Sequence, residues 1–193
     1  MEMLTSPAGQ GGLFLIQFVI GLVIFALMLR FLLRATHADW RNPIVQFIAK
    51  ATNPLCLPAN KVIATKGRWD WSAILTALVI QALFVWVIGH FTGRDFGVGI
   101  IAIASITEIM NQLLDMMFWL IVIQAVLSWV SPGNNPNTDI FNQLTRPILE
   151  PFQRMIPPMG GLDLSPIAAI LAIKLFQIVV VSSIAQLARG MMS

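Results

Sequence analysis

The sequence predicts an all-α integral membrane protein with four transmembrane helices, arranged as two tandem parallel repeats with amphipathic interfacial connectors. Three observations lead to this fold class. The chain is 57% hydrophobic and only 11% charged, with a mean hydropathy of +0.79, whereas a soluble domain carries about 25% charged residues. The apolar residues are gathered in long runs, and part of the sequence repeats itself after 93 residues.

The four transmembrane helices are expected where the apolar runs reach about 18–23 residues. At 1.5 Å per residue, a run of this length crosses a hydrocarbon core of roughly 30 Å. Charged side chains are rare inside these runs. The four predicted spans cover residues 13–33, 72–91, 113–130 and 165–187.

The internal repeat sets the domain organisation. Residues 42–80 align without a gap on residues 135–173, with 12 identities in 39 positions. Most identities are Pro, Gly, Asn, Asp, Ser and Thr, which fix turns and helix caps, so the repeat is structural rather than a chance match of apolar runs. We expect a first repeat over 13–91, a central linker over 92–112 and a second repeat over 113–189.

The central linker contains a shorter apolar run, residues 97–110, which is rich in β-branched residues. Apolar runs of about 10–14 residues are more often interfacial or re-entrant than spanning. The alternative is a fifth span, which would break the symmetry of the two repeats.

The number of spans fixes the relative orientation of the repeats. Two spans per repeat make both repeats enter the membrane in the same direction, related by a pseudo-two-fold axis along the membrane normal. The connectors 34–71 and 131–164 then lie on one side and carry eight Lys or Arg, six of them in the first connector. The other side carries only Arg94 and Arg189. The positive-inside rule therefore predicts that both connectors are cytoplasmic.

Both connectors contain apolar residues at helical spacing, as in helices that lie in the headgroup plane. Prolines within them remove backbone donors, so we expect bent segments rather than long helices. Two readings stay open, because these faces could pack on the protein's own helix ends or could dock lipid or a partner. The apolar positions are Ile44, Phe47, Ile48, Ala51 and Leu55 in the first connector, and Ile140, Leu144, Ile148 and Phe152 in the second.

Each connector ends in a Gly, Asp and Ser pattern that suits the start of the following span. Ser165 is a typical N-cap, Pro166 suits a first helical turn, and Asp163 adds negative charge beside the helix dipole. The pattern could serve only caps and turns, or it could form a ligand site at these two helix ends. The whole connector motif comprises Asn42, Pro43, Pro54, Pro58, Gly67 and Asp70, and then Asn135, Pro136, Pro147, Pro151, Pro157, Pro158, Gly160, Gly161, Asp163, Ser165 and Pro166.

The second connector carries a family resemblance. Its motifs are Ser128-Trp129, Asn135-Pro136, Pro147-Ile-Leu-Glu-Pro151-Phe, Ile156-Pro157-Pro158-Met159-Gly160-Gly161 and Asp163-Leu-Ser165-Pro166. This pattern resembles the YggT family, also called YlmG-like, of small bacterial and plastid membrane proteins, in its two-repeat proteobacterial form. The first repeat departs from it, with Ala64-Thr65 in place of the paired prolines.

The resemblance implies a membrane protein without an established catalytic residue. Members of the family have been linked to osmotic-stress tolerance and cation uptake, to cell division and nucleoid placement, and in plastids to cytochrome assembly. It also implies residence in the bacterial inner membrane as a multi-pass protein.

Lys174 is the residue that most calls for a function. It lies nine residues into the last span, about 13 Å deep, where a charge costs on the order of 3 kcal/mol. Its repeat equivalent is Gln81, Gln177 lies one turn further on, and Gln124 in the third span is within reach of its stem. Asp115 is a better charge partner but lies about 9 Å further along the axis. These residues could line an ion path or hold the helices together by hydrogen bonds.

The sequence favours a non-enzymatic protein. It contains no Gly-rich phosphate loop, HExxH or GxSxG pattern, its single Cys56 cannot form an intrachain disulfide, and we expect no metal, cofactor or nucleic acid. We expect Arg30, near the end of the first span, to snorkel to the interface. The partners we expect are the lipid bilayer and a second copy or another membrane protein. The predicted function is a scaffold or assembly factor of the inner membrane, with an oligomeric channel or transporter in osmotic or ion homeostasis as the alternative.

Overall fold

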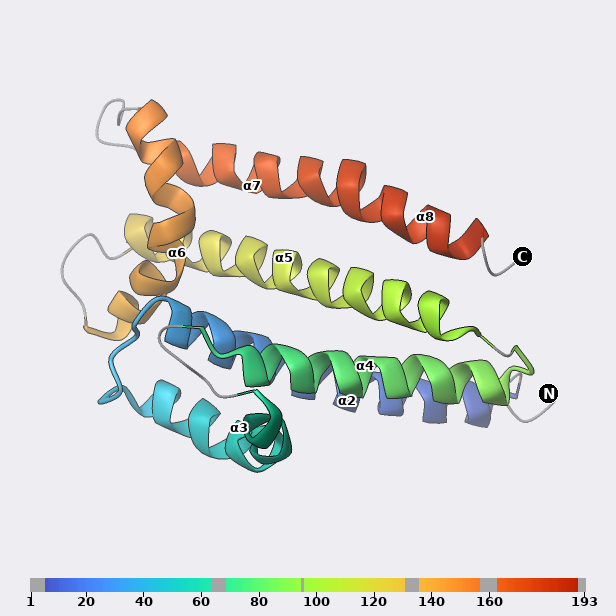
Figure 1. Ribbon diagram of the computed structural model, residues 1–193. Coiled ribbons are helices and arrows are strands. Elements are labelled where there is room, and N and C mark those ends of the chain that lie inside the picture. The colour runs from blue at the N-terminus through green and yellow to red at the C-terminus, as the bar shows by residue number, and fades with distance from the viewer. Residues whose placement is uncertain (1–5, 64–68, 95, 131–135, 157–162, 191–193) are drawn as a thin grey trace.

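The computed structural model describes residues 6–63, 69–94, 96–130, 136–156 and 163–190, and within them every regular element is helical. Four long helices run side by side, and two shorter helices lie across one end of them (Figure 1). In chain order the elements are α2 (Pro7–Ala35), α3 (Pro43–Val62), α4 (Trp71–Phe91), α5 (Val98–Val130), α6 (Pro136–Met155), α7 (Ser165–Phe176), the π-helical η1 (Gln177–Val181) and α8 (Ser182–Gly190).

The prediction of four transmembrane helices in two tandem repeats is confirmed. The segments that are long and apolar enough to cross a membrane are Pro7–Ala35, Trp71–Phe91, Val98–Ser128 and Ser165–Gln186. The last of these is continuous through α7, η1 and α8. Each repeat is thus a pair of long helices with a shorter helix between them.

The central region differs from the expectation. Residues 98–112, expected in an interfacial linker or a fifth span, are neither, because they form the first half of α5. No Gly or Pro interrupts the chain between Gly99 and Val130, so nothing stops the helix once it has begun. The linker between the repeats is correspondingly short. At 1.5 Å per residue, the 33 residues of α5 are about 50 Å long.

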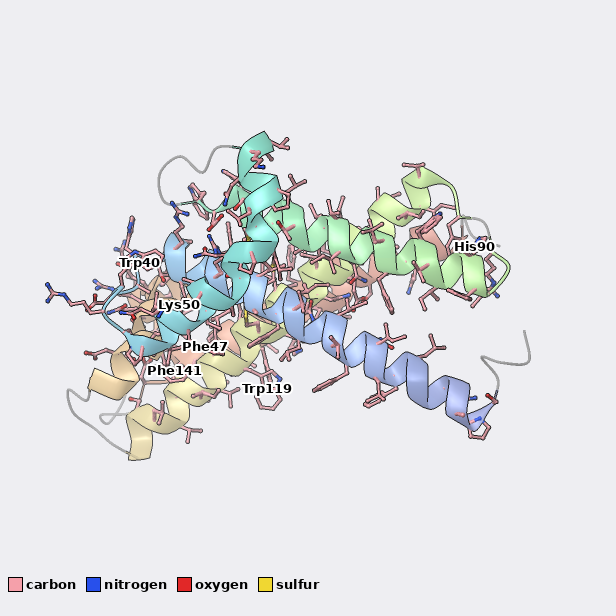
Figure 2. All side chains as sticks on the ribbon, turned by 90° about the horizontal axis from the view of Figure 1, so that it is seen from below. Trp40, Phe47, Lys50, His90, Trp119 and Phe141 are labelled. Carbon is pink, nitrogen blue, oxygen red and sulfur yellow. The ribbon has the colours of Figure 1, made fainter. Side chains whose placement is uncertain are left out.

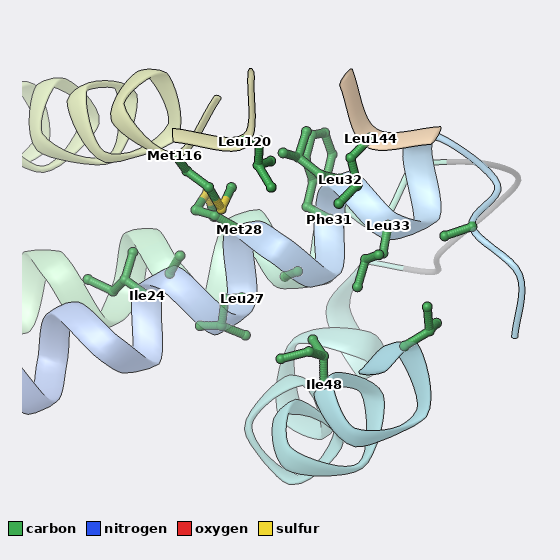
Figure 3. Close-up of a cluster of buried hydrophobic side chains, with 14 of the residues drawn as sticks. Ile24, Leu27, Met28, Phe31, Leu32, Leu33, Ile48, Met116, Leu120 and Leu144 are labelled. Carbon is green, nitrogen blue, oxygen red and sulfur yellow. The ribbon is translucent and has the colours of Figure 1, made fainter. Parts of the chain in front are cut away.

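The packing of the spans is unequal in the two repeats. Helix α4 packs on α2 of its own repeat and on α5 of the next repeat, whereas α7 packs mainly on α5 and α6 (Figure 1). The main hydrophobic core therefore lies within the first repeat and its junction with α5. Figure 3 shows this core, which gathers side chains such as Leu27, Met28, Phe31, Met116 and Leu120.

The connectors form continuous helices. Helix α3 runs through Pro54 and Pro58, and α6 runs through Pro147 and Pro151. This corrects the expectation that the prolines would prevent long helices. A proline removes one backbone donor and crowds the preceding turn, and a helix can accommodate both effects by bending. In Figure 1 the second half of α3 is turned so that it is seen nearly end-on.

The caps are partly as predicted. The side chain of Asn42 accepts a hydrogen bond from the Ile44 amide, and Pro43 opens α3. Pro136 opens α6 in the same way. Ser165, however, is the first residue of α7, and Leu164 is the N-cap, without a side-chain cap hydrogen bond. Asp163 Oδ1 accepts a hydrogen bond of 2.9 Å from the Ser165 amide. The motif residues Gly67, Asn135, Pro157, Pro158, Gly160 and Gly161 lie outside the described residues.

Candidate functional site

A buried ion cluster lies at the connector end of the first repeat, and Asp70 is its centre. The Asp70 side chain is fully buried at the N-cap of α4. Its Oδ2 lies 2.9 Å from Arg30 Nε and 3.2 Å from an Arg34 guanidinium nitrogen. Its Oδ1 accepts a hydrogen bond of 2.6 Å from the Ser72 hydroxyl. One carboxylate therefore joins the end of α2 to the start of α4.

The same cluster fastens α3. Arg30 donates to Thr52 Oγ1 at 3.0 Å and to Asn53 Oδ1 at 2.6 Å, and both acceptors lie on α3. Arg30 was expected to snorkel, and instead it is the hub that connects three helices. Sequence reasoning missed this contact because Asp70 lies forty residues away, beyond any local spacing rule.

The cluster keeps Asp70 ionised. Burial alone would raise the pKa of the Asp70 carboxyl, but the hydrogen bonds from Ser72 and Arg30 and the charge of Arg30 outweigh it, so its pKa lies below the ordinary value. A buried carboxylate that is paired in this way is costly to leave without its partners.

Among the described residues of the second repeat, no such cluster lies at the equivalent place. Ile123 and Leu127 stand where the first repeat has Arg30 and Arg34. Asp163, the equivalent of Asp70, is only half-buried and accepts a hydrogen bond of 2.9 Å from Gln153 Nε2. Burial raises the pKa of Asp163, and hydrogen bonds from Ser165 and Gln153 more than offset this, so its pKa is also lowered.

The second repeat instead carries a polar cluster within its spans. Lys174 Nζ lies 2.8 Å from Asp115 Oδ1 and donates to Gln177 Oε1 at 3.0 Å. Gln177 Nε2 donates in turn to Asn111 Oδ1 and to Asp115 Oδ1, each at 3.2 Å. Lys174 Nζ also lies 4.6 Å from the centre of the Phe118 ring. This cluster joins α7 and η1 to α5.

The structure thus unites three of the five predicted intramembrane residues: Asp115, Lys174 and Gln177. Gln124 lies elsewhere, where its Nε2 donates to Asn142 of α6 at 3.2 Å. Gln81 is buried in α4, and within the described part of the chain it makes no hydrogen bond to Lys174 or Gln177. Sequence reasoning overlooked Asn111 and Phe118, although each lies about one helical turn from Asp115 on α5.

The polar cluster lies near the middle of the two spans that it joins. Asp115 is close to the midpoint of Val98–Ser128, and Lys174 is close to the midpoint of Ser165–Gln186. A membrane-buried ion pair normally faces a bundle interior or a water-filled cavity.

This ion pair is not enclosed in the single chain. The Lys174 side chain is 38% exposed and the Asp115 side chain is 51% exposed. The π-helical segment begins at Gln177, a member of the same cluster, and π-helical turns are frequent at functional sites. The cluster is therefore an exposed polar feature on an apolar surface.

The two connector helices present opposite faces. Phe47 on α3 is 68% exposed, whereas its repeat equivalent Ile140 on α6 is 4% exposed. Ala51 on α3 is likewise exposed and its equivalent Leu144 is buried. Figure 2 shows Trp40, Phe47 and Lys50 gathered at the connector end. We call Ile44, Phe47, Ala51 and Leu55 the outer face of α3; all four are exposed.

The apolar faces of the two connector helices differ in whether they are covered by the protein itself. The α6 face packs on the protein itself, because Ile140 and Leu144 belong to the main core cluster. The outer face of α3 stays uncovered, while Ile48 on the neighbouring side of α3 is buried. In the described ranges no group of three or more His, Cys, Asp or Glu is placed to hold a metal ion.

Comparisons with known proteins agree with the two-repeat architecture. The CCB3/YggT family model matches residues 10–91 and again residues 103–184. The uncharacterised protein PA0392 of Pseudomonas aeruginosa is 36% identical over 176 residues, which cover 90% of this chain and 89% of that protein. The uncharacterised protein YggT of Escherichia coli K12 is 35% identical over 158 residues, 82% of each chain. The chloroplastic YlmG homolog protein 2 of Arabidopsis thaliana is 39% identical over 57 residues, 30% of this chain and 23% of that protein. No solved structure matches the chain.

Proposed function

The chain belongs to the CCB3/YggT family, and from this premise we propose that it is a non-enzymatic scaffold or assembly factor of the bacterial inner membrane. Its working surface is the connector layer, and its docking site is the outer face of α3. The observation that carries the proposal is the exposure of this apolar face, with Phe47 68% exposed beside the buried side of the same helix.

The geometry of α3 favours a docking role over simple anchoring. One side of α3 is buried in the bundle, as expected for a structural connector. The outer face adds a second apolar stripe that the fold does not use. Exposed apolar patches of this kind mark protein or membrane contacts. The Arg30–Asp70 cluster holds α3 against the bundle through Thr52 and Asn53, which suits a docking surface of fixed position.

The positive charge of the connectors supports a cytoplasmic location for this surface. Eight of the twelve Lys and Arg residues lie on the connectors, and the positive-inside rule assigns such loops to the cytoplasmic side. A partner would then be another inner-membrane protein that reaches the cytoplasmic headgroup layer.

The experiment is a detergent-free extraction of the protein from its native membrane. We expect wild type to retain a partner membrane protein in stoichiometric amount, and Phe47→Ser to lose it. Gln46→Ser, which alters a neighbouring exposed polar position, is the matched control and keeps the partner. Wild-type protein that carries only lipid would overturn the scaffold proposal.

The intramembrane cluster favours one second candidate, an oligomeric channel or transporter in osmotic or ion homeostasis. Asp115 and Lys174 are charged and accessible near mid-membrane, as in many ion pathways. A pathway would need several copies, because four spans enclose little space. Ion flux in proteoliposomes that changes with Lys174→Met supports this candidate. Absence of flux from correctly folded protein rejects it.

A further inference from the structure

Because the chain contains two repeats, the exposure of each residue on α7 can be compared with that of its equivalent on α4. Ile74, Leu78 and Gln81 lie on the covered side of α4; Gln81 is only 7% exposed, and the other two pack on the main core. Their repeat equivalents on α7 are Ile167, Leu171 and Lys174. Leu171 is 60% exposed, Ile167 is exposed to a similar degree, and Lys174 is half-buried.

The reason for this difference lies in the neighbours. Helix α4 contacts α2 of its own repeat and α5 of the next repeat. Helix α7 contacts α5 of its own repeat, and in the described part of the chain no helix takes the place on α7 that α5 takes on α4. The uncovered side of α7 is therefore the surface onto which a further repeat would pack.

At the opposite edge of the molecule, α2 and α3 of the first repeat lack the neighbour that a preceding repeat would provide. Ile109 of α5 is buried against the first repeat, while its equivalent on α2, Ile16, is exposed. The connectors agree, because Ile140 of α6 is buried in the first repeat's core and its equivalent Phe47 of α3 is exposed. Thus α3 and the N-terminal part of α2 leave uncovered the surfaces by which α6 and α5 pack on a preceding repeat, whereas Leu27 of α2, the equivalent of Leu120, is already buried in the chain's own core.

We propose that a second copy of this chain fills both gaps, with α2 of one copy seated on the uncovered side of α7 of the other. The contact repeats the junction between α4 and α5, so it continues an interface that the chain already contains. Both copies keep the same orientation in the membrane. A contact between two different surfaces makes a closed assembly when its rotation closes, and two copies of two repeats then form a ring of four. The inference goes beyond the proposed function in one respect, since it makes a second copy of the chain the occupant of the outer face of α3.

The intramembrane ion pair supports this occupant. Lys174 lies at the edge of the uncovered side of α7, next to the exposed Leu171, and its Nζ lies 2.8 Å from Asp115 Oδ1 of α5. A protein neighbour at this position removes the pair from hydrocarbon and leaves it enclosed at a helix interface, which is the usual setting for charges at mid-membrane. In the first repeat the corresponding position is Gln81, already enclosed by the packing around α4.

The test is a disulfide between two differently tagged copies that are co-expressed in a Cys56→Ala background. One copy carries Leu171→Cys on α7, and the other carries Val23→Cys on α2. Val23 is half-buried at the edge of the chain's own core, and it is the repeat equivalent of Met116, which is buried at the junction of the repeats. We expect mild oxidation of native membranes to give a covalent dimer that contains both tags.

The matched control moves the second cysteine by one position, to Leu22→Cys. This site has the same depth but lies about 100° around α2, so the yield of mixed dimer is expected to fall several-fold. Equal yields for Val23→Cys and Leu22→Cys, or no mixed dimer, would overturn the inference. As a second measurement that needs no cysteine, the combined change Ile167→Ala and Leu171→Ala is expected to lower the dimer fraction of protein extracted in lipid discs. An unchanged dimer fraction contradicts the proposed surface.

These results separate this inference from the scaffold proposal. A stoichiometric foreign partner that depends on Phe47, without any mixed disulfide, retains the scaffold and rejects the second copy on α7. A mixed disulfide without a foreign partner supports self-assembly and rejects docking of another protein on α3.

Discussion

The two repeats share a backbone plan but place their charged groups at different depths. In the first repeat, Arg30 and Arg34 meet Asp70 at the connector end. In the second, Lys174 meets Asp115 near mid-membrane. The residues that both repeats keep are mainly the caps and prolines of the connectors, and both repeats have the same order of helices. The charged contacts are therefore additions to a common frame, and each repeat uses them to fasten a different part of it.

The two repeats are expected to differ most in the stability that is lost when their equivalent aspartates, Asp70 and Asp163, are changed. Asp70→Asn is expected to lower the free energy of unfolding by about 3–5 kcal/mol, because it leaves two arginines without their buried partner. Asp163→Asn is expected to cost about 1 kcal/mol, since it weakens hydrogen bonds at a half-buried site. Unfolding of both variants in lipid discs by denaturant measures the difference. Equal losses would show that the buried cluster does not distinguish the repeats.

A second prediction converts one repeat into the other within the membrane. Lys174→Gln introduces the residue of the first repeat, and it leaves Asp115 unpaired at a cost of about 2–3 kcal/mol. Adding Asp115→Leu, which also copies the first repeat at Leu22, is expected to restore most of the loss. Stability of the two single variants and the double variant gives the coupling energy. A double variant no better than Lys174→Gln alone contradicts the ion pair.

The connector helices provide a third pair of matched sites. Ile140→Ser is expected to destabilise the protein by about 2 kcal/mol, because it removes buried apolar surface. Phe47→Ser is expected to change stability by less than about 0.5 kcal/mol, since the site is exposed. Thermal unfolding of both variants in the same lipid discs checks the contrast. A large loss for Phe47→Ser would mean that α3 is held by its outer face.

Acid provides a smaller and more specific test of the Asp70 cluster. The folded-state pKa of Asp70 lies below its ordinary value of 3.8, so its contribution to stability is present above about pH 3.8 and is lost as the pH falls through the folded pKa. The slope reaches at most about 1.4 kcal/mol per pH unit for one proton. Wild type is expected to lose more stability than Asp70→Asn between pH 5 and pH 3. Parallel curves for the two proteins would contradict this assignment.

Sequence reasoning located the features that depend on local chemistry. The four spans follow from length and hydropathy, and Asn42 with Pro43 forms the predicted helix start. It failed where the answer depends on residues distant in sequence. The partner of Arg30 could not be read from spacing, because a tertiary contact brings Asp70 to it. Residues 98–112 were separated from the third span because their polar end, Thr107-Glu108, weakened the hydropathy signal, although nothing in the chain there stops a helix.

The candidate site shows the same division. The sequence identified Lys174 as a costly charge and named Asp115 as its better partner, although at an unfavourable axial distance. In the structure Lys174 Nζ lies 2.8 Å from Asp115 Oδ1. Gln124 was placed with Lys174 on depth alone, but it points toward α6. Depth along a span can be counted from the sequence, whereas the direction of a side chain around the span depends on how the helices are rotated.

The π-helical segment between α7 and α8 gives the last span a built-in change of screw register. Ser182 donates its amide to the Gln177 carbonyl, five residues back, so one residue more than an α-turn is held there. If this turn tightened to an α-turn, everything after it would rotate by about 100° and slide by about 1.5 Å. Helix α7 and its Lys174–Asp115 contact would stay in place, so the far half of the span can turn as a separate segment on a fixed base.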